Sequence, residues 1–242
     1  MFSKKVVVEM RNTYKYVAFF LMMLFSEYML IMNGTRDAGV LYDGILFHSR
    51  FEFYLMNFSL FCVLPLYFFH IFEDTIAERA ALYVTRGISR KAFYRVFAKK
   101  IIGGVISYEI LKIIVYLVFG YLIHGGSFYI ADFSFLICMV VLNIVIEIGI
   151  IHLQMYLEIF YNSRLALLAV LLYYLISVIM GDMLFTNEIY GIPFILFLPN
   201  AMMHLRLEII TIAPISFLIV GGISTVLVFK LGQMRFCRKD LL

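Results

Sequence analysis

Residues 73–100 read EDTIAERAALYVTRGISRKAFYRVFAKK and separate two long apolar runs. This segment carries seven of the twenty Lys and Arg residues of the chain, whereas the flanking runs carry few charges. Positive residues in a short loop keep that loop on the cytosolic side of a membrane. The segment therefore predicts the orientation of the chain in the membrane, with residues 73–100 on the cytosolic side.

The composition points to lipid as the solvent of this chain. Of the 242 residues, 64% are hydrophobic and 15% are charged, against about 45–50% and about 25% in a soluble domain. A soluble fold of this length would expose too much of that apolar surface to water. The net charge of +4 gives no indication of a nucleic-acid partner, because the positive residues gather beside the apolar runs.

Six apolar stretches approach or reach the roughly 20 residues that a helix needs to cross a bilayer. They are residues 16–32, 53–72, 101–123, 133–157, 165–185 and 209–231. A seventh run, residues 189–203, is shorter and is broken by Pro193 and Pro199, which favours a re-entrant or interfacial hairpin within the outer segment 186–208. We therefore expect an all-α integral membrane protein with six transmembrane helices, forming a single domain over residues 1–242.

The distribution of positive residues predicts the orientation. Inner segments 1–15, 73–100, 159–164 and 230–242 hold 16 Lys and Arg residues, whereas the outer segments hold three, Arg36, Arg50 and Arg206. Both termini are thus expected in the cytosol. Residues 1–15 mix basic and apolar side chains, which suits either a helix lying on the inner leaflet or an ordinary basic tail.

The basic segment also contains signals for two helices. Thr75 and Glu78 have the spacing of a capping box, and Gly87 suits a helix end. Ser89 is placed to cap a second helix that starts at Arg90 and runs into the third span. The first helix has a small apolar face that suits a groove on another protein; the alternative is a solvated inner loop. The face consists of Ile76, Ala77, Ala80, Ala81 and Val84.

The same segment resembles a pattern of ABC-2-type transporter permeases. The matching residues are Ile76-Ala77-Glu78-Arg79, Leu82, Ile88-Ser89-Arg90 and then Lys99 or Lys100. The chain departs from the pattern at Ala81, near a usual Gly-Thr pair, and at Gly87, where Pro is common. The arrangement of the spans resembles that family over the whole chain.

The resemblance implies a transport subunit and not an enzyme. Two such permeases, identical or paralogous, would rest on two separate ABC ATPase subunits that bind ATP and Mg, and this chain would bind no cofactor. The chain has no GxxxxGK[ST] phosphate loop, the motif that cradles nucleotide phosphates. ATPase coupling is implied for Thr75, Ile76, Ala77, Glu78, Arg79, Ala80, Ala81, Leu82, Val84, Gly87, Ser89 and Arg90.

The expected location is the bacterial cytoplasmic membrane, in contact with lipid. The abundance of Phe and Met in the spans favours a hydrophobic or amphipathic cargo moved by alternating access. A peptide, toxin or bacteriocin is the first expectation, and a lipid or drug the second.

Four ionisable residues fall within the apolar runs: Glu27, Glu109, Lys112 and Glu147. Charges at bilayer depth are costly and usually face protein or water. Glu109 and Lys112 are three apart, so they share a helix face and are able to pair, and Glu147 is placed to join them. These residues either line a transport path or fix the packing between helices.

Two other classes of protein remain as alternatives. An ATP-independent carrier, channel or scaffold would need no ATPase partner. An intramembrane enzyme is less favoured, because Glu73-Asp74 is followed by Glu78 where such a protease pattern needs Arg. The scattered Cys62, Cys138 and Cys237 suggest no disulfide, and no metal site is predicted.

Overall fold

The structure is a computed structural model that describes residues 20–32, 36–75, 89–189, 192–210 and 213–238, together with Val17. It is helical throughout and, over these residues, has no strand beyond an isolated bridge between Asp37 and Tyr129. Five segments are long and apolar enough to cross a membrane. They are α2 (Phe51–Phe68) with α3 (Ile71–Thr75), α5 (Arg90–His124), α6 (Phe133–Phe160), α7 (Ser163–Thr186) and α10 (Pro214–Arg238). The chain is therefore an all-helical protein of the multi-pass membrane type.

The first apolar run forms a shorter helix, Phe20–Met32, within the described residues. The expected span over residues 16–32 begins outside them, as does the whole of the expected interfacial segment 1–15. Residues 76–88, which hold most of the expected coupling helix, also lie outside the described part of the chain.

Side-chain caps explain where three of the long helices begin. Ser89, Asp132 and Asn162 each accept a hydrogen bond from the backbone amide three residues further on. Such a bond satisfies one of the amides that a helix leaves without a partner in its first turn. The prediction that Ser89 caps a helix starting at Arg90 is confirmed.

Helix α5 continues from this cap without a break for 35 residues. At about 1.5 Å per residue its length is about 52 Å, which exceeds the roughly 30 Å hydrocarbon core of a bilayer. Its first turns carry Arg90, Lys91, Arg95, Lys99 and Lys100. The part of the basic segment from Arg90 onward and the third span are thus one continuous helix.

Two expected spans have different limits in the structure. The second span is interrupted after α2, where His70 has a left-handed backbone with φ of 65° and α3 begins at Ile71. The last span begins at Pro214 and not at residue 209, because residues 209–210 belong to α9 (His204–Ile210). Proline has no amide hydrogen, so it starts a helix readily but rarely continues one.

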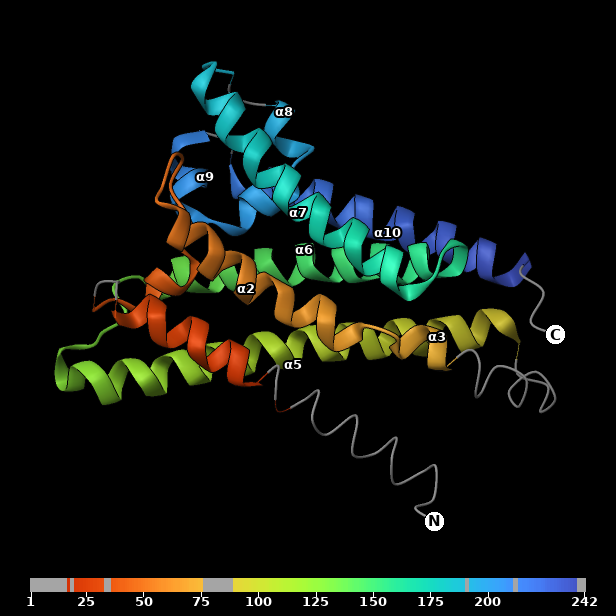
Figure 1. Cartoon of the computed structure of the whole chain (residues 1–242), viewed down its shortest axis with the longest axis horizontal. Coiled ribbons are helices and arrows are strands. Elements are labelled where there is room, and N and C mark those ends of the chain that lie inside the picture. The colour runs from red at the N-terminus through yellow and green to blue at the C-terminus, as the bar shows by residue number, and fades with distance from the viewer. Residues whose placement is uncertain are drawn as a thin grey trace, which may run out of the picture.

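The outer segment expected to form a hairpin is instead a series of short helical pieces. These are α8 (Ile192–Ile195), the 3-10 helix η4 (Leu198–Met202) and α9. Pro199 lies at the start of η4, consistent with the preference of proline for a first turn. η4 packs against α6 and α7, so this segment closes the end of the bundle that lies away from the start of α5 and the end of α10 (Figure 1).

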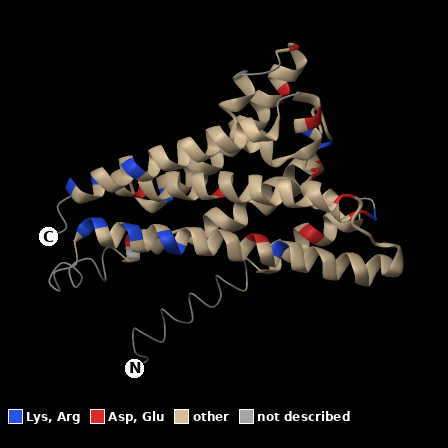
Figure 2. Cartoon of the chain, turned by 180° about the vertical axis from the view of Figure 1, so that it is seen from behind, with Lys and Arg blue, Asp and Glu red and all other residues tan. Residues whose placement is uncertain are grey.

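Helix α6 is the centre of the bundle, with α10 packed along it and α5 and α7 beside it. The start of α5 and the end of α10 lie at the same end of the molecule (Figure 1). Lys and Arg residues gather at that end, whereas Asp and Glu are more frequent toward the other end (Figure 2). An aromatic core of Phe72, Phe93, Phe97 and Phe236 fills the basic end.

Candidate functional site

Helix α5 places Glu109 and Lys112 inside the bundle, with 0% and 4% of their surfaces exposed. The Lys112 ammonium donates a hydrogen bond to Oε1 of Glu109, so the predicted pair is confirmed. Tyr42, from the 3-10 helix η1 (Ala38–Tyr42), donates its hydroxyl to Oε2 of Glu109 at 2.7 Å. Both carboxylate oxygens of Glu109 thus accept hydrogen bonds from side-chain donors.

Two further glutamates join this pair from other helices. Glu147 of α6 lines the same cavity as Lys112, and the Lys112 ammonium interacts electrostatically with Glu147 and with Glu27 of helix Phe20–Met32. Both glutamates are buried, at 4% and 0% exposure. The four residues Glu27, Glu109, Lys112 and Glu147 are named the lysine–glutamate cluster below. The sequence predicted that Glu147 was placed to join the pair, but it offered no partner for Glu27.

The cluster is incompletely hydrogen-bonded within the described residues. Neither carboxyl oxygen of Glu27 has a hydrogen-bond partner there, and neither does Oε2 of Glu147. A buried polar group without a partner costs about 1–3 kcal/mol, and a charged group costs more. Such a group is retained for a reason other than stability, so the cluster is the leading candidate for a functional site.

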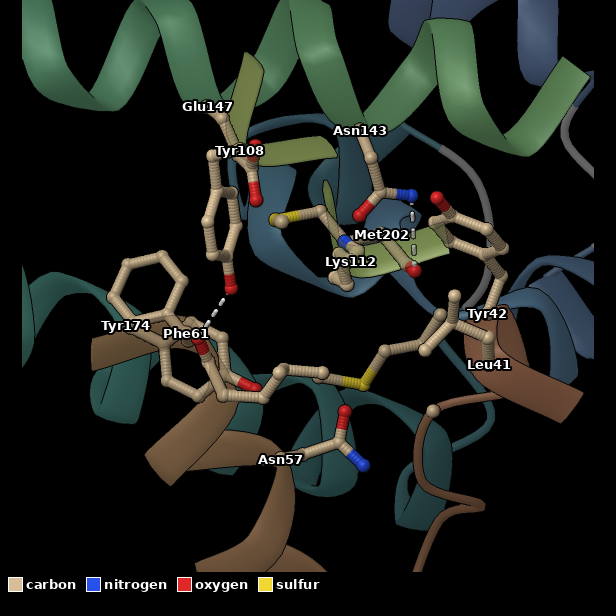
Figure 3. Close-up of a pocket in the computed structure, with 13 residues that line it drawn as sticks. Leu41, Tyr42, Asn57, Phe61, Tyr108, Lys112, Asn143, Glu147, Tyr174 and Met202 are labelled. Carbon is tan, nitrogen blue, oxygen red and sulfur yellow. Dashed lines mark hydrogen bonds between the residues drawn. The ribbon is translucent and has the colours of Figure 1, made fainter. Parts of the chain in front are cut away.

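A small cavity adjoins the cluster, with Glu147, Lys112 and Tyr42 on its wall and Asn143 and Asn57 nearby (Figure 3). Asn143 donates to the Met202 carbonyl at 3.4 Å. The cavity has a volume of ≈ 30 Å³, which is about the share of one water molecule in the liquid. It offers polar contacts to a water or a proton but is too small for an organic cargo.

Sequence reasoning did not identify a second buried polar network, centred on Arg206. Arg206 was expected in an outer loop, but it is 0% exposed. Its guanidinium donates to the carbonyls of Ile45 at 2.9 Å and Val178 at 3.1 Å. It also donates to the side chains of Asn200 at 2.6 Å and Asp182 at 2.9 Å. Ile45, Val178 and Asp182 are 24 to 161 positions away in the sequence, so no local sequence signal reveals them.

The Arg206 network joins the short helices to the long ones. Burial lowers the pKa of Arg206, and the nearby Asp182 carboxylate raises it. Tyr54 of α2 donates to the other Asp182 oxygen at 2.6 Å, and the Arg206 guanidinium stacks 4.6 Å from the centre of the Phe47 ring. Because its bonds join α2, α7, η4 and α9, Arg206 fixes the short outer helices to the bundle.

Part of the expected coupling segment lies within the described residues. Thr75 is the last residue of α3 and donates its hydroxyl to the Ile71 carbonyl at 2.5 Å. It is therefore a helical residue, and the expected N-cap position for Thr75 is wrong. Ser89 and Arg90 form the start of α5. The remaining coupling residues, from Ile76 to Gly87, lie outside the described part of the chain.

Both ends of this segment are tied to the bundle. Before it, Glu73 accepts hydrogen bonds from the hydroxyl and the amide of Ser163 at the start of α7. After it, Arg90 donates to the Cys237 carbonyl near the end of α10 at 3.2 Å. Phe72 also lies 4.8 Å from Phe97 of α5, measured between ring centres. The described residues on the two sides of this segment, Glu73 and Arg90, are thus both bonded to the bundle at its basic end.

A wide lateral groove opens between helix Phe20–Met32, α2 and α5. Its volume is ≈ 630 Å³ and its surface is mostly apolar, with Gly103, Gly104 and Ser107 as the small residues that leave the space and Lys100 at one end. Ligand sites commonly have about 300–1,000 Å³. Within the described ranges, no group of three or more His, Cys, Asp or Glu side chains has an arrangement that could hold a metal ion.

Comparison with known proteins gives a family but no named relative. Neither a curated protein nor a solved structure matches the chain. Residues 6–242, nearly the whole sequence, match a family described as "Protein of unknown function (DUF2705)". The chain therefore belongs to the DUF2705 family, and its structure is an all-helical bundle with a buried lysine–glutamate cluster.

Proposed function

We propose that this chain is the membrane-spanning subunit of an ATP-driven transporter of the ABC-2 exporter type. It would cross the bacterial cytoplasmic membrane six times, with helix Phe20–Met32 in the first span and both termini in the cytosol. The observation that carries the proposal concerns the described residues that flank 76–88: Glu73 of α3 is bonded to α7, and Arg90 of α5 is bonded to α10. A partner that pushes on this segment pushes on three spans together.

Helix α5 supplies the mechanical connection in this proposal. It runs unbroken from the cap at Ser89 past Lys112, a distance of about 35 Å at about 1.5 Å per residue. A hydrogen-bonded helix without a proline or a bulge moves as a rod. ATP-driven closure of two ATPase subunits against residues 75–90 would therefore shift the lysine–glutamate cluster and the lateral groove.

The character of the groove supports a hydrophobic or amphipathic cargo. It opens sideways between apolar helices, and Lys100 lies at one end of it. An amphipathic peptide such as a toxin or bacteriocin fits this arrangement best, followed by a lipid or a drug. Pairing with a second permease, identical or paralogous, would place two such grooves in one transporter.

The decisive experiment is copurification of the tagged chain, co-expressed with its neighbouring genes, with ATP hydrolysis measured on the eluate. We expect a stoichiometric ATPase. The double substitution Ala80→Asp/Ala81→Asp should abolish its copurification while the chain still inserts, because two charges would disrupt an apolar docking face. Ala131→Asp, at an exposed alanine between α5 and α6, is the matched control and should have no effect. A wild-type chain that elutes alone, or a double variant that retains the ATPase, would refute the proposal.

A second candidate function, an ATP-independent carrier, is favoured by one observation. Buried glutamates within spans, such as Glu27 and Glu147, are typical of proton relays in transporters. The purified chain in liposomes distinguishes the two functions. Transport that follows an imposed proton gradient and stops with a proton ionophore, in the absence of any ATPase, would favour the carrier.

A further inference from the structure

The charges of the lysine–glutamate cluster do not balance if every group is ionised. Glu27, Glu109 and Glu147 would bring three negative charges and Lys112 one positive charge, so the cluster would carry −2. No other cationic side chain acts on Glu27 or Glu147 among the described residues. An uncompensated pair of charges in a buried site is far more costly than the protonated alternative.

The hydrogen bonds indicate where two protons would reside. Glu109 accepts hydrogen bonds from Lys112 and Tyr42, so both of its oxygens already have donors. Glu147 is buried on the wall of the cavity that Lys112 also lines, and its Oε2 has no hydrogen-bond partner among the described residues. Neither oxygen of Glu27 has a donor among the described residues, and a carboxylate without any donor is the least stable form of that group.

We propose that the lysine–glutamate cluster is a proton-binding site that holds two exchangeable protons, one on Glu27 and one on Glu147. The packing of helix Phe20–Met32, α5 and α6 around Lys112 then depends on those protons. Separation of the helices exposes the glutamates to water and releases the protons. This inference concerns the chain by itself and does not rest on an ATPase partner.

A metal ion is the other means of neutralising two carboxylates, and the structure argues against it. Bound cations need several ligands at fixed distances, and within the described ranges no group of three or more His, Cys, Asp or Glu side chains is arranged to hold one. The ≈ 30 Å³ cavity beside Glu147 has room for about one water.

The other titratable groups around the cluster do not replace the protons. Phenols and a thiol face it from η1, α2, α5 and α7, and these groups are neutral near pH 7 because their ordinary pKa values are about 10 and about 8.5. They are Tyr42, Cys62, Tyr108, Tyr116 and Tyr174. Asp43 and Asp37 lie near Tyr116 and only add negative charge.

The pH dependence of stability in detergent tests this inference. The folded chain would hold two protons on Glu27 and Glu147. Unfolding exposes both glutamates to water, where their pKa is about 4.3, and the protons are released. Because the folded state then binds more protons, stability falls as pH rises. The folding equilibrium constant should drop about tenfold per pH unit for each proton between about pH 5.5 and pH 8.5. Glu27→Gln/Glu147→Gln replaces both acids with neutral isosteres and should remove that dependence.

Glu52→Gln/Glu188→Gln, at two exposed glutamates, is the matched control and should keep the wild-type slope. Dicyclohexylcarbodiimide, which reacts with protonated carboxyl groups in apolar surroundings, gives a second measurement by mass spectrometry of the labelled peptides. We expect labelling at Glu27 and Glu147 and not at Glu52. A Glu27→Gln/Glu147→Gln variant with the wild-type pH slope would overturn the proposal whatever the labelling pattern.

Discussion

Replacement of Lys112 by methionine tests whether the four buried charges act as one unit. Methionine has a similar length but no charge, so the substitution leaves Glu109 buried without its cation. The least costly response is to protonate Glu109 as well. Relative to an exposed glutamate with a pKa of about 4.3, this costs about 3.7 kcal/mol at pH 7, at about 1.36 kcal/mol per pH unit. The loss should shrink to about 1 kcal/mol at pH 5.

Substitution of Glu109, the partner of Lys112, should reduce the free energy of unfolding much less. In Glu109→Gln the amide oxygen still accepts from Tyr42, and Glu147 releases its proton to become the counter-ion of Lys112. We therefore expect a loss of about 1 kcal/mol or less, because the release of that proton offsets the lost ion pair. The double variant Lys112→Met/Glu109→Gln has no charge to balance and should be close to wild type. An isolated ion pair would instead lose about 3–5 kcal/mol with either single substitution.

The free energy of unfolding is measurable by denaturation in mixed micelles at pH 7 and pH 5. Far-UV circular dichroism suits this chain, which has no Trp for fluorescence. Equal losses for the two single variants, or a Lys112→Met loss that does not change with pH, would refute the idea of a shared cluster. Folding of each variant is checked by its helix content before denaturation.

Three further predictions concern other parts of the fold and are read by the same denaturation assay. Arg206→Lys should cost about 3–5 kcal/mol, because lysine lacks the fork that bonds Asp182, Asn200 and two carbonyls at once; a loss below about 1 kcal/mol would contradict the network. Gly181→Ala should cost about 1–3 kcal/mol, because its methyl group would lie 2.4 Å from Oδ1 of Asn200. Gly222→Ala, with nothing within 4 Å, is its control and should be neutral or stabilising. Ser89→Ala should cost about 1 kcal/mol and Ser89→Asp should restore it, with unchanged stability of Ser89→Ala as the contrary result.

The features that the sequence predicted correctly depend on neighbours within one or two helical turns. Ser89 caps α5 because a cap needs only the amide three residues ahead. Glu109 and Lys112 pair because a spacing of three places them on one helix face. The long apolar runs predict helices because a backbone in lipid must satisfy its own hydrogen bonds.

The limits of the elements were less predictable where the backbone changes direction. The break at His70 and the start of α10 at Pro214 lie inside runs that are apolar throughout, and hydropathy alone does not divide such a run. The outer segment gave two prolines as a signal, but the signal indicates only that a long helix is disfavoured. It does not specify the three short pieces α8, η4 and α9.

Composition and local spacing thus determined by themselves that this chain is a helical membrane protein with a basic end and a buried Glu109–Lys112 pair. Only the tertiary structure decided that Glu27 and Glu147 share Lys112, and that Arg206 is fully buried among carbonyls up to 161 positions away. The physical reason is the range of the interactions. Caps and same-face pairs act within a turn, whereas the balance of buried charge depends on which helices pack together.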